Sequence, residues 1–296
     1  MLNVYEQLDQ SKRRSSLLIF LFIAFVLGIA YFISYFYELD SSFIIFSTLF
    51  AVSYSLLSFF TGDKMVLFLN RARPAKREEY FDFYTAVENI SLAAQIPMPK
   101  IYIIPSSAPN AFATGRDPKH ASLAATTGLL EKLSRSELEA VVAHEIGHIG
   151  NFDIRLMMLI STLIGALSIL TDIFLRSGFL HQGRKSDDDN RSSGPLAIIG
   201  FLLIILSPLI ARLMQLAVSR SREFLADASS AKLTRQPAAL ISALEKISAD
   251  PTPLQTASPT TANIYLTNPF KGKKVTNLFS THPPIEERIR RLKEML

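Results

Sequence analysis

The segment VVAHEIGHIGNFD, residues 141–153, carries two histidines one helical turn apart. On a helix, His144 and His148 lie about 40° apart in projection, so their imidazoles can bind one metal ion. Glu145 is offset by about 100°, so its carboxylate can face a water molecule at that ion without binding the metal itself. This HExxH spacing indicates metal-assisted hydrolysis of a peptide bond.

Such a site needs a third protein ligand and one open coordination position. The chain contains no cysteine, which excludes thiolate zinc sites, disulfides and cysteine nucleophiles. Any metal must therefore be held by His, Asp or Glu. In SRSREFLADASS, Glu223 and Asp227 share a helical face. We expect one Zn²⁺ per chain, with Glu223 as third ligand and Asp227 orienting a ligand histidine through the other ring N–H.

The helix that carries the histidines has a marked beginning. Ser134 followed by Glu137 is typical of a capping box, and no proline or glycine interrupts the segment before Gly147. Together with Glu137, Arg135 and Glu139 make this helix too polar to lie in lipid. We therefore expect the site at the cytoplasmic surface of a membrane, which disfavours cleavage within the bilayer.

One further helix and three strands are expected before this helix. Residues 78–96 carry a stripe at helical spacing, which we interpret as core packing. Residues 100–104, 110–114 and 120–126 read as short strands separated by Pro, Ser and Gly, which predicts a small antiparallel sheet. The stripe consists of Tyr80, Phe83, Tyr84, Val87, Ile90 and Ala94.

Two uncharged runs near the N-terminus are long enough to cross a bilayer. Ser15–Tyr37 has 23 residues and Ser41–Gly62 has 22, against the roughly 20 that a spanning helix needs. The first run is expected to be a retained anchor rather than a cleaved signal. Basic residues flank the pair while the connection between the runs carries only acidic ones, which predicts that both ends are cytoplasmic. The basic residues are Lys12, Arg13, Arg14, Lys64, Arg71, Arg73, Lys76 and Arg77.

Two weaker runs follow the histidine helix, from Leu156 to Leu175 and from Ser192 to Ala211. Glu223 can lie near His144 only if the segment 156–211 begins and ends on the same side of the membrane. These runs must therefore form a hairpin, or neither crosses. Asp172 within the third run is interpreted as the interfacial end of a tilted helix rather than as an intramembrane functional carboxylate.

The expected fold is that of a mainly α membrane protein with about four transmembrane helices and a cytoplasmic, zincin-like α+β metalloprotease domain with a small antiparallel sheet. We divide the chain into an N-terminal transmembrane hairpin (1–62), a first half of the protease domain with the zinc helix (63–155), a second hydrophobic hairpin (156–211) and a second half of the protease domain (212–296).

Charge and motifs narrow the function classes. The net charge of +5 comes from basic residues that flank apolar runs rather than from an aromatic-interleaved patch, so no nucleic-acid partner is expected. No G-x-x-x-x-G-K-[ST] is present, so no nucleotide is expected either. The alternative is a non-catalytic membrane scaffold or transporter with structural histidines, although a transporter would show internal repeats and broken spans.

Nearly the whole chain resembles the HtpX proteases, membrane-integrated zinc metalloproteases related to CAAX prenyl proteases. The resemblance rests on the two hydrophobic pairs, PNAFATG at 109–115, HEIGHIGNFD from residue 144, SREFLAD from residue 221 and FSTHPPIEERI from residue 279. It implies His144, His148 and Glu223 as zinc ligands and Glu145 as the catalytic carboxylate.

The same resemblance extends to substrate and location. His282 is a candidate donor to the tetrahedral oxyanion, and Arg288 completes a spacing that resembles the downstream active-site pair of the family. It implies polypeptide substrates, expected to be unfolded or misassembled membrane proteins, and quality control as a multi-pass protein of the bacterial inner membrane, in contact with the lipid bilayer. The expected substrate-binding strand consists of Asn110, Ala111, Phe112, Ala113, Thr114 and Gly115.

Overall fold

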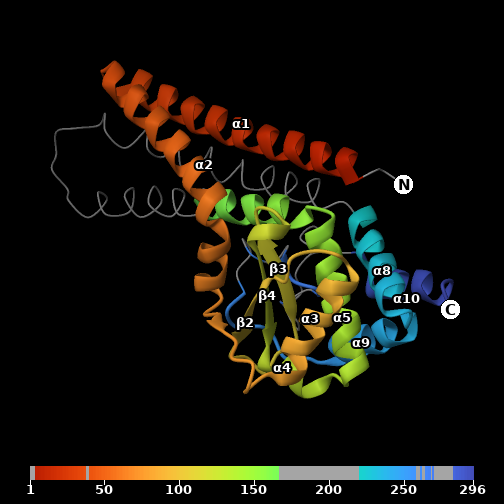
Figure 1. Ribbon diagram of the computed structural model, residues 1–296. Coiled ribbons are helices and arrows are strands. Elements are labelled where there is room, and N and C mark those ends of the chain that lie inside the picture. Colours follow the sequence, from red (N-terminus) through yellow and green to blue (C-terminus); the bar gives the residue numbers. More distant parts are fainter. Residues whose placement is uncertain are drawn as a thin grey trace.

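A four-stranded sheet lies at the centre of the polar part of the molecule, with helices around it (Figure 1). The computed structural model describes residues 4–37, 40–166, 220–257, 261, 264–267, 269 and 283–296. Its elements are α1 (Val4–Tyr37), α2 (Ser41–Leu69), β1 (Arg73–Pro74), α3 (Phe81–Ala93), β2 (Lys100–Ile104), β3 (Ala111–Gly115), a 3₁₀ turn (Pro118–His120), β4 (Ala121–Thr126), α4 (Thr127–Lys132), α5 (Arg135–Gly150), a helix at Asp153–Ala166, α8 (Arg220–Thr234), α9 (Pro237–Ala249) and α10 (Ile285–Lys293).

The sheet is mixed, so the prediction of an antiparallel sheet was wrong. The strand order is β1-β2-β4-β3, with β2 parallel to β4 and the β1–β2 and β3–β4 pairs antiparallel. The direction alternates along the chain, as in a simple meander, and the three predicted strands form close to their expected bounds. However, β4 inserts between β2 and β3, which places it beside a strand that runs in the same direction.

Both faces of the sheet are covered. Side chains alternate between the two faces along each strand, so each strand contributes residues to two hydrophobic clusters. Ile101, Ile103 and Leu123 face the cluster formed with α3, α5 and α9. Ile104 and Phe112 face a second cluster with the end of α2, the helix at Asp153–Ala166, and Leu254, Ile264 and Tyr265. Strands covered on both faces are apolar throughout rather than alternating. The predicted stripe of α3 packs in the first cluster, with Phe83, Val87 and Ile90 buried and Tyr80, Tyr84 and Ala94 partly buried against them.

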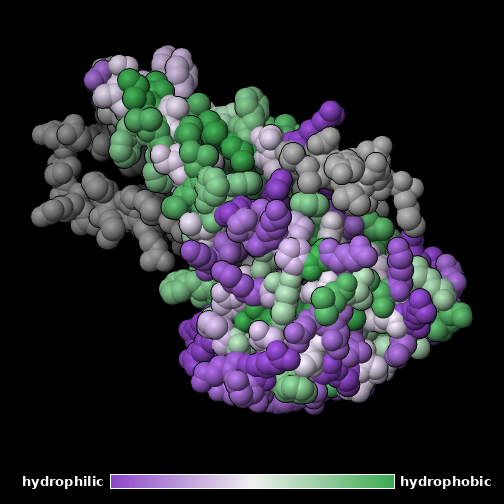
Figure 2. All heavy atoms as spheres, in the orientation of Figure 1, coloured by the Kyte–Doolittle hydropathy of each residue, from purple (hydrophilic) through white to green (hydrophobic). Residues whose placement is uncertain are grey.

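The apolar helices α1 and α2 gather at one end of the molecule (Figures 1 and 2). Large hydrophobic side chains on their surfaces are exposed, whereas hydrophilic residues cover most of the visible face of the sheet domain (Figure 2). Within the described ranges, α2 is long and apolar enough to span a bilayer, and α5 with the helix at Asp153–Ala166 qualifies as a second candidate if this bent pair is one span. The exposed residues include Leu17, Phe20, Tyr31, Tyr35, Phe46, Leu49, Leu56, Leu57 and Phe60.

The predicted hydrophobic hairpins are described in part. The first run lies within α1, and α2 continues past Gly62 to Leu69. The third run is described only as far as Ala166, while Asp172 and the fourth run lie outside the described residues. The count of four spans and the four-part division of the chain therefore stay predictions.

A sharp bend separates α5 from the helix that follows it. The two axes differ by 83°, and the chain turns through Asn151 and Phe152, whose φ of 60° is left-handed. The second helix then packs beneath α2, where the Tyr54 hydroxyl donates to the Thr162 carbonyl at 3.0 Å. Only Asn151 and Phe152 therefore separate α5, which carries the two histidines, from a helix that packs against the apolar helix α2.

Candidate metal centre

Helix α5, which carries the two candidate metal ligands His144 and His148, begins at the predicted capping box. The backbone N–H of Ser134 donates to Glu137 Oε2 at 2.7 Å, and the backbone N–H of Glu137 donates to Ser134 Oγ at 3.5 Å. From Ala140 to Ile149 every residue is buried. This capped start and buried length fix the helix against the sheet, so its histidines project from a rigid support.

Helix α8 approaches α5 through small residues. A Cβ added at Gly147 would lie 3.0 Å from Ser229 Cβ and 3.4 Å from Ala226 Cα. The Ser230 hydroxyl donates to the Ala140 carbonyl at 2.7 Å, one further contact between the two helices. Glycine at position 147 therefore lets α8 lie close enough for its first turn, which carries Glu223, to reach the histidines.

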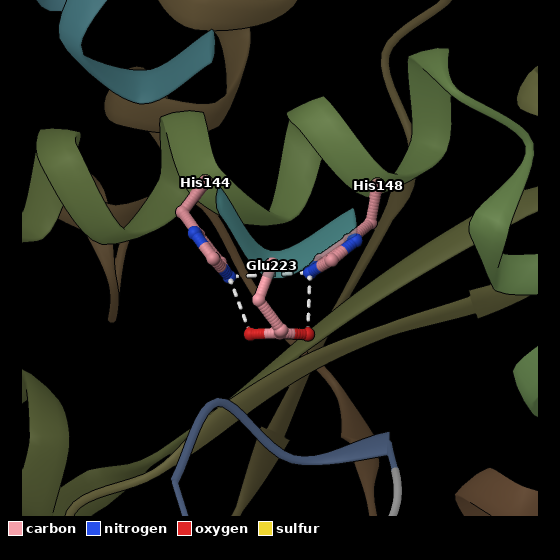
Figure 3. Close-up of side chains that lie close together, drawn as sticks. All are labelled: His144, His148 and Glu223. Carbon is pink, nitrogen blue, oxygen red and sulfur yellow. Dashed lines mark hydrogen bonds and ion pairs between the residues drawn. The ribbon is translucent and has the colours of Figure 1, made fainter. Parts of the chain in front are cut away.

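His144, His148 and Glu223 converge from α5 and α8 on one point (Figure 3). The two Nε2 atoms are 3.2 Å apart. Glu223 Oε2 lies 3.8 Å from His144 Nε2, and Glu223 Oε1 lies 3.5 Å from His148 Nε2. All three side chains are buried, with at most 5% of each exposed.

These distances fit a tetrahedral metal ion. With metal–ligand bonds of 2.0–2.1 Å, two donors at tetrahedral corners are about 3.3 Å apart. The two nitrogens are 3.2 Å apart, the nearest Glu223 oxygen to each nitrogen, a different oxygen in each case, lies at 3.5 or 3.8 Å, and one ligand atom from each residue lies within 4.8 Å of the others. Two imidazoles and one carboxylate supply three of four positions, which is the donor number of hydrolytic zinc sites. The residues present therefore fit a metal ion.

His144 is held on its far side by a carboxylate and a guanidinium. Its Nδ1 lies 2.9 Å from Asp227 Oδ1. Arg288 donates to both oxygens of Asp227, through Nε at 2.9 Å and Nη2 at 2.7 Å, and its Nη1 donates to the Leu266 carbonyl at 3.2 Å. A carboxylate at Nδ1 leaves the Nε2 lone pair free to bind a metal.

His148 has a second carboxylate and guanidinium of its own. Its Nδ1 lies 3.1 Å from Asp153 Oδ2. Arg222 Nη1 donates to Asp153 Oδ1 at 2.6 Å. Each of the two candidate ligand histidines therefore has an Asp–Arg pair at its Nδ1 side.

The two histidines differ in proton affinity. Burial lowers the pKa of His144 to about 4, with the Asp227 hydrogen bond opposing this shift and the Arg288 charge adding to it. Burial also disfavours the charged form of His148, but the Asp153 hydrogen bond and the charges of Glu223, Asp153 and Glu145 outweigh it and raise this pKa to about 9. Metal binding requires neutral imidazoles, so His148 must lose a proton.

Asp227 stays ionised over the whole physiological range. Burial would raise its pKa, but the charge of Arg288 and the hydrogen bonds from His144 and Arg288 lower it to about 2. The Asp227 carboxylate is therefore an acceptor for His144 at any pH at which the protein works.

The other predicted site residues lie in different places. Glu145 is buried beside the ligands on α5. Arg288 is 1% exposed, and its guanidinium is engaged by Asp227. His282 lies outside the described residues. The predicted substrate strand is β3 with Asn110 directly before it, and all six residues are buried.

One edge of β3 pairs with β4, and the other is partly occupied. The Leu266 N–H donates to the Ala111 carbonyl at 2.9 Å. Alternation along the strand then directs the backbone groups of Ala113 and Gly115 to the same outer edge. Gly115 has φ 144°, and a Cβ there would lie 2.3 Å from the His120 carbonyl oxygen, so this position requires glycine.

Two residues of the site, Asp153 and Arg222, were missed by the sequence analysis. Both lie inside the motifs that were quoted, five residues after His148 and directly before Glu223. The charged pair flanking an apolar segment was the available signal. It could not be read as a contact, because the pair is 69 positions apart.

The sheet, the crossed helices α5 and α8 and the buried His-His-Glu cluster are features of a metallopeptidase. The sequence model of Peptidase family M48 matches residues 82–296. The chain belongs to this family.

Its relatives carry a more specific name. The chain is 42% identical to a Protease HtpX homolog from Caldanaerobacter subterraneus subsp. tengcongensis and to one from Thermoanaerobacter pseudethanolicus, each over 294 residues that make up 99% of this chain and 98% of the relative. It is 43% identical over 292 residues to one from Tropheryma whipplei, with the same shares covered. The predicted family is confirmed. The chain is a membrane-anchored metalloprotease acting on polypeptides, and the scaffold or transporter alternative is not favoured.

A solved structure shares the fold. The crystal structure of S. mikatae Ste24p superposes with a TM-score of 0.50 at 23% sequence identity, over 96% of this chain and 64% of that chain. This chain therefore spans less than two thirds of the length of that protein.

Proposed function

We propose that the chain is a zinc endopeptidase of the bacterial inner membrane whose protease domain faces the cytoplasm. The observation that carries the proposal is the buried triangle of His144, His148 and Glu223, with donor separations close to those of a tetrahedral ion. Imidazole nitrogens with one carboxylate suit Zn²⁺, whereas Mg²⁺ and Ca²⁺ prefer oxygen ligands alone.

Zinc, when bound, would supply a Lewis acid that polarises a carbonyl and acidifies water. The proton that the attacking water loses must be accepted by a residue of this chain. We assign Glu145 to accept it from the attacking water and deliver it to the leaving amine, because Glu145 follows the ligand His144 on the same helix and its charge reaches His148. Hydrolysis then requires no covalent enzyme intermediate.

The downstream pair receives two different roles in this proposal. The Arg288 guanidinium is engaged by Asp227, so we assign it to hold Asp227 and, through it, His144. The donor to the tetrahedral oxyanion is then His282. We further propose that a substrate pairs with β3 beyond Ala111, where Ala113 and Gly115 direct backbone groups outward. Backbone pairing accepts many sequences, which suits unfolded or misassembled membrane proteins as substrates.

Membrane anchoring through α1 and α2 is supported by their exposed apolar surfaces. The guanidinium groups of Arg116 and Arg155 lie over the rings of Phe60 and Phe59, at 5.5 and 5.7 Å. These contacts suit the level where an apolar helix leaves the lipid. The basic flanks of the N-terminal hairpin support a cytoplasmic protease domain.

The proposal is tested with the full chain in detergent. The parent protein is stripped with a chelator, reloaded with zinc and incubated with an unfolded test polypeptide, beside the variants Glu145→Gln and Glu223→Ala. We expect one zinc per parent chain and zinc-dependent cleavage. Glu145→Gln should keep its zinc and lose cleavage by 100-fold or more, in line with removal of a general base. Glu223→Ala should lose zinc.

A matched control is Glu139→Gln, a helix α5 carboxylate paired with Arg135 on the surface. Its zinc content and cleavage rate should equal those of the parent. Equal cleavage by Glu145→Gln and the parent would remove the role of Glu145. Full zinc occupancy in Glu223→Ala would remove the third ligand.

A further inference from the structure

The ion pair of Asp153 and Arg222 lies where the chain leaves the metal site and where it returns. Asp153 is the first residue of the helix at Asp153–Ala166, and Arg222 lies in the first turn of α8. Between them in the sequence lie residues 156–211, the segment predicted to form the second hydrophobic hairpin and called the hydrophobic detour below. The 2.6 Å contact from Arg222 Nη1 to Asp153 Oδ1 therefore joins the two segments that flank this detour.

The same carboxylate also reaches the metal site. Asp153 Oδ2 lies 3.1 Å from His148 Nδ1, so one oxygen faces the histidine and the other the arginine. Asp153 is 2% exposed, and 14% of the Arg222 side chain is exposed. A carboxylate fixed at both oxygens has one orientation, and that orientation determines the ring plane and tautomer of the histidine.

A third element approaches this pair. Arg14 lies at the beginning of the first apolar run, on α1. Burial lowers the pKa of Arg14, the charge of Arg222 lowers it further and the charge of Asp153 raises it. Arg14 is therefore within electrostatic range of both partners. The charges of the ion pair therefore act on Arg14 of α1 as well as on the helix at Asp153–Ala166 and on α8.

We propose that Asp153 and Arg222 are positioning residues for His148, and that their ion pair makes retention of the metal depend on the contact between the beginning of the helix at Asp153–Ala166 and the first turn of α8. The inference rests on the proposed function, because it assumes that His148 binds zinc. It assigns Arg222 an effect on the metal ion without contact to it. A structural brace would instead stabilise the fold and leave the coordination geometry unchanged.

The test uses the full chain in detergent, loaded with Zn²⁺ or with Co²⁺, whose visible absorption reports ligand geometry. The variants are Asp153→Asn, Arg222→Gln, Arg222→Lys and the double variant Asp153→Asn/Arg222→Gln. The readouts are the rate of zinc release to excess chelator and the Co²⁺ spectrum. Arg290→Gln is the control, because it breaks the exposed ion pair between Arg290 and Glu294.

We expect Asp153→Asn to accelerate zinc release by about 10-fold to 100-fold, the usual effect of losing the partner of a ligand histidine. Arg222→Gln should accelerate it several-fold and shift the Co²⁺ spectrum in the same direction. Arg222→Lys should restore most of the parent rate, because one N–H contact is enough to hold Asp153 Oδ1. If Arg222 acts through Asp153, the double variant releases zinc no faster than Asp153→Asn alone.

The inference is overturned if both single variants keep the parent spectrum and release rate while only their melting temperatures fall. It is also overturned if the effects of the two substitutions add, because Arg222 would then act independently of Asp153. A parent chain that binds no zinc at all would overturn the proposed function, and the inference with it. Arg290→Gln should match the parent in both readouts.

Discussion

The two histidines proposed as metal ligands are each supported by an aspartate paired with an arginine, but the two pairs lie in different parts of the molecule. Behind His144, Asp227 and Arg288 come from α8 and α10, and Arg288 donates two hydrogen bonds to Asp227 with 1% of its side chain exposed. Behind His148, the Asp153 carboxylate takes one contact from Arg222, and both lie at the base of the hydrophobic detour. We call these two Asp–Arg pairs the His144 arm and the His148 arm. The His144 arm belongs to the protease domain alone, whereas the His148 arm also depends on the apolar segments.

The largest expected effect is a difference in the free energy of unfolding between variants of the two arms. Arg288→Met should lower the free energy of unfolding by about 3–5 kcal/mol, because it leaves the buried Asp227 charge unpaired. Arg222→Gln should cost about 1–3 kcal/mol, because its side chain is partly exposed and the amide can still donate one hydrogen bond. Urea unfolding of the metal-free chain in detergent, followed by circular dichroism, measures both. Equal costs would break the comparison.

An intermediate effect is expected where the arms meet, at the contact of α5 with α8. Gly147→Ala places a methyl group 3.0 Å from Ser229 Cβ, which pushes α8 and Glu223 away from both histidines. The cost of such overpacking is about 1–3 kcal/mol, and zinc affinity should fall with it. Gly150→Ala is the control, since nothing lies within 4 Å of its added methyl group. A loss of zinc affinity confined to Gly147→Ala supports the close approach, whereas equal behaviour contradicts it.

The smallest expected effect is a difference in proton release. His148, with a pKa raised to about 9, is protonated at pH 7 in the metal-free protein, whereas His144, lowered to about 4, is neutral. Zinc affinity should therefore rise about tenfold, or about 1.4 kcal/mol, per pH unit from 6 to 8. Calorimetry at pH 7 in two buffers should find at least one proton released per zinc, the one from His148, with any further release coming from water at the metal.

Asp153→Asn sharpens this prediction. It removes the carboxylate whose hydrogen bond and charge raise the pKa of His148. The pH dependence of zinc affinity should then flatten, and fewer protons should be released at pH 7. Release of no proton by the parent at pH 7 would mean that His148 is already neutral in the metal-free protein, which would contradict the difference between the two histidines.

The cluster of candidate ligands and the helices that carry it could be predicted from sequence because they depend on local spacing. The i, i+4 pair His144 and His148 and the capping box at Ser134 each require only a helix, and the resemblance to HtpX proteases supplied support for Glu223. The strand bounds were also close, since Pro, Ser and Gly end the strands. The order of strands was missed, because antiparallel and mixed arrangements of the same three strands bury the same apolar residues.

The Asp–Arg arms required tertiary structure. Asp227 was assigned to a histidine because it shares a helical face with Glu223. Asp153 follows His148 by five residues, and on a continuous helix it would point elsewhere; only the 83° bend turns it back toward the ring. Arg222 then reaches it across a segment whose length gives no information about where the chain returns.

The residue at this bend has a mechanical consequence. Phe152 holds the left-handed φ of 60° that glycine would adopt without steric cost, and its ring lies under the Arg155 guanidinium at 5.9 Å. For a residue with a side chain, this conformation costs about 1–2 kcal/mol and has little rotational freedom. The backbone at Phe152 is therefore restricted to a narrow range of φ and ψ values. Because Asp153 is the first residue of the helix that follows this bend, a rotation of that helix would move the carboxylate that contacts His148.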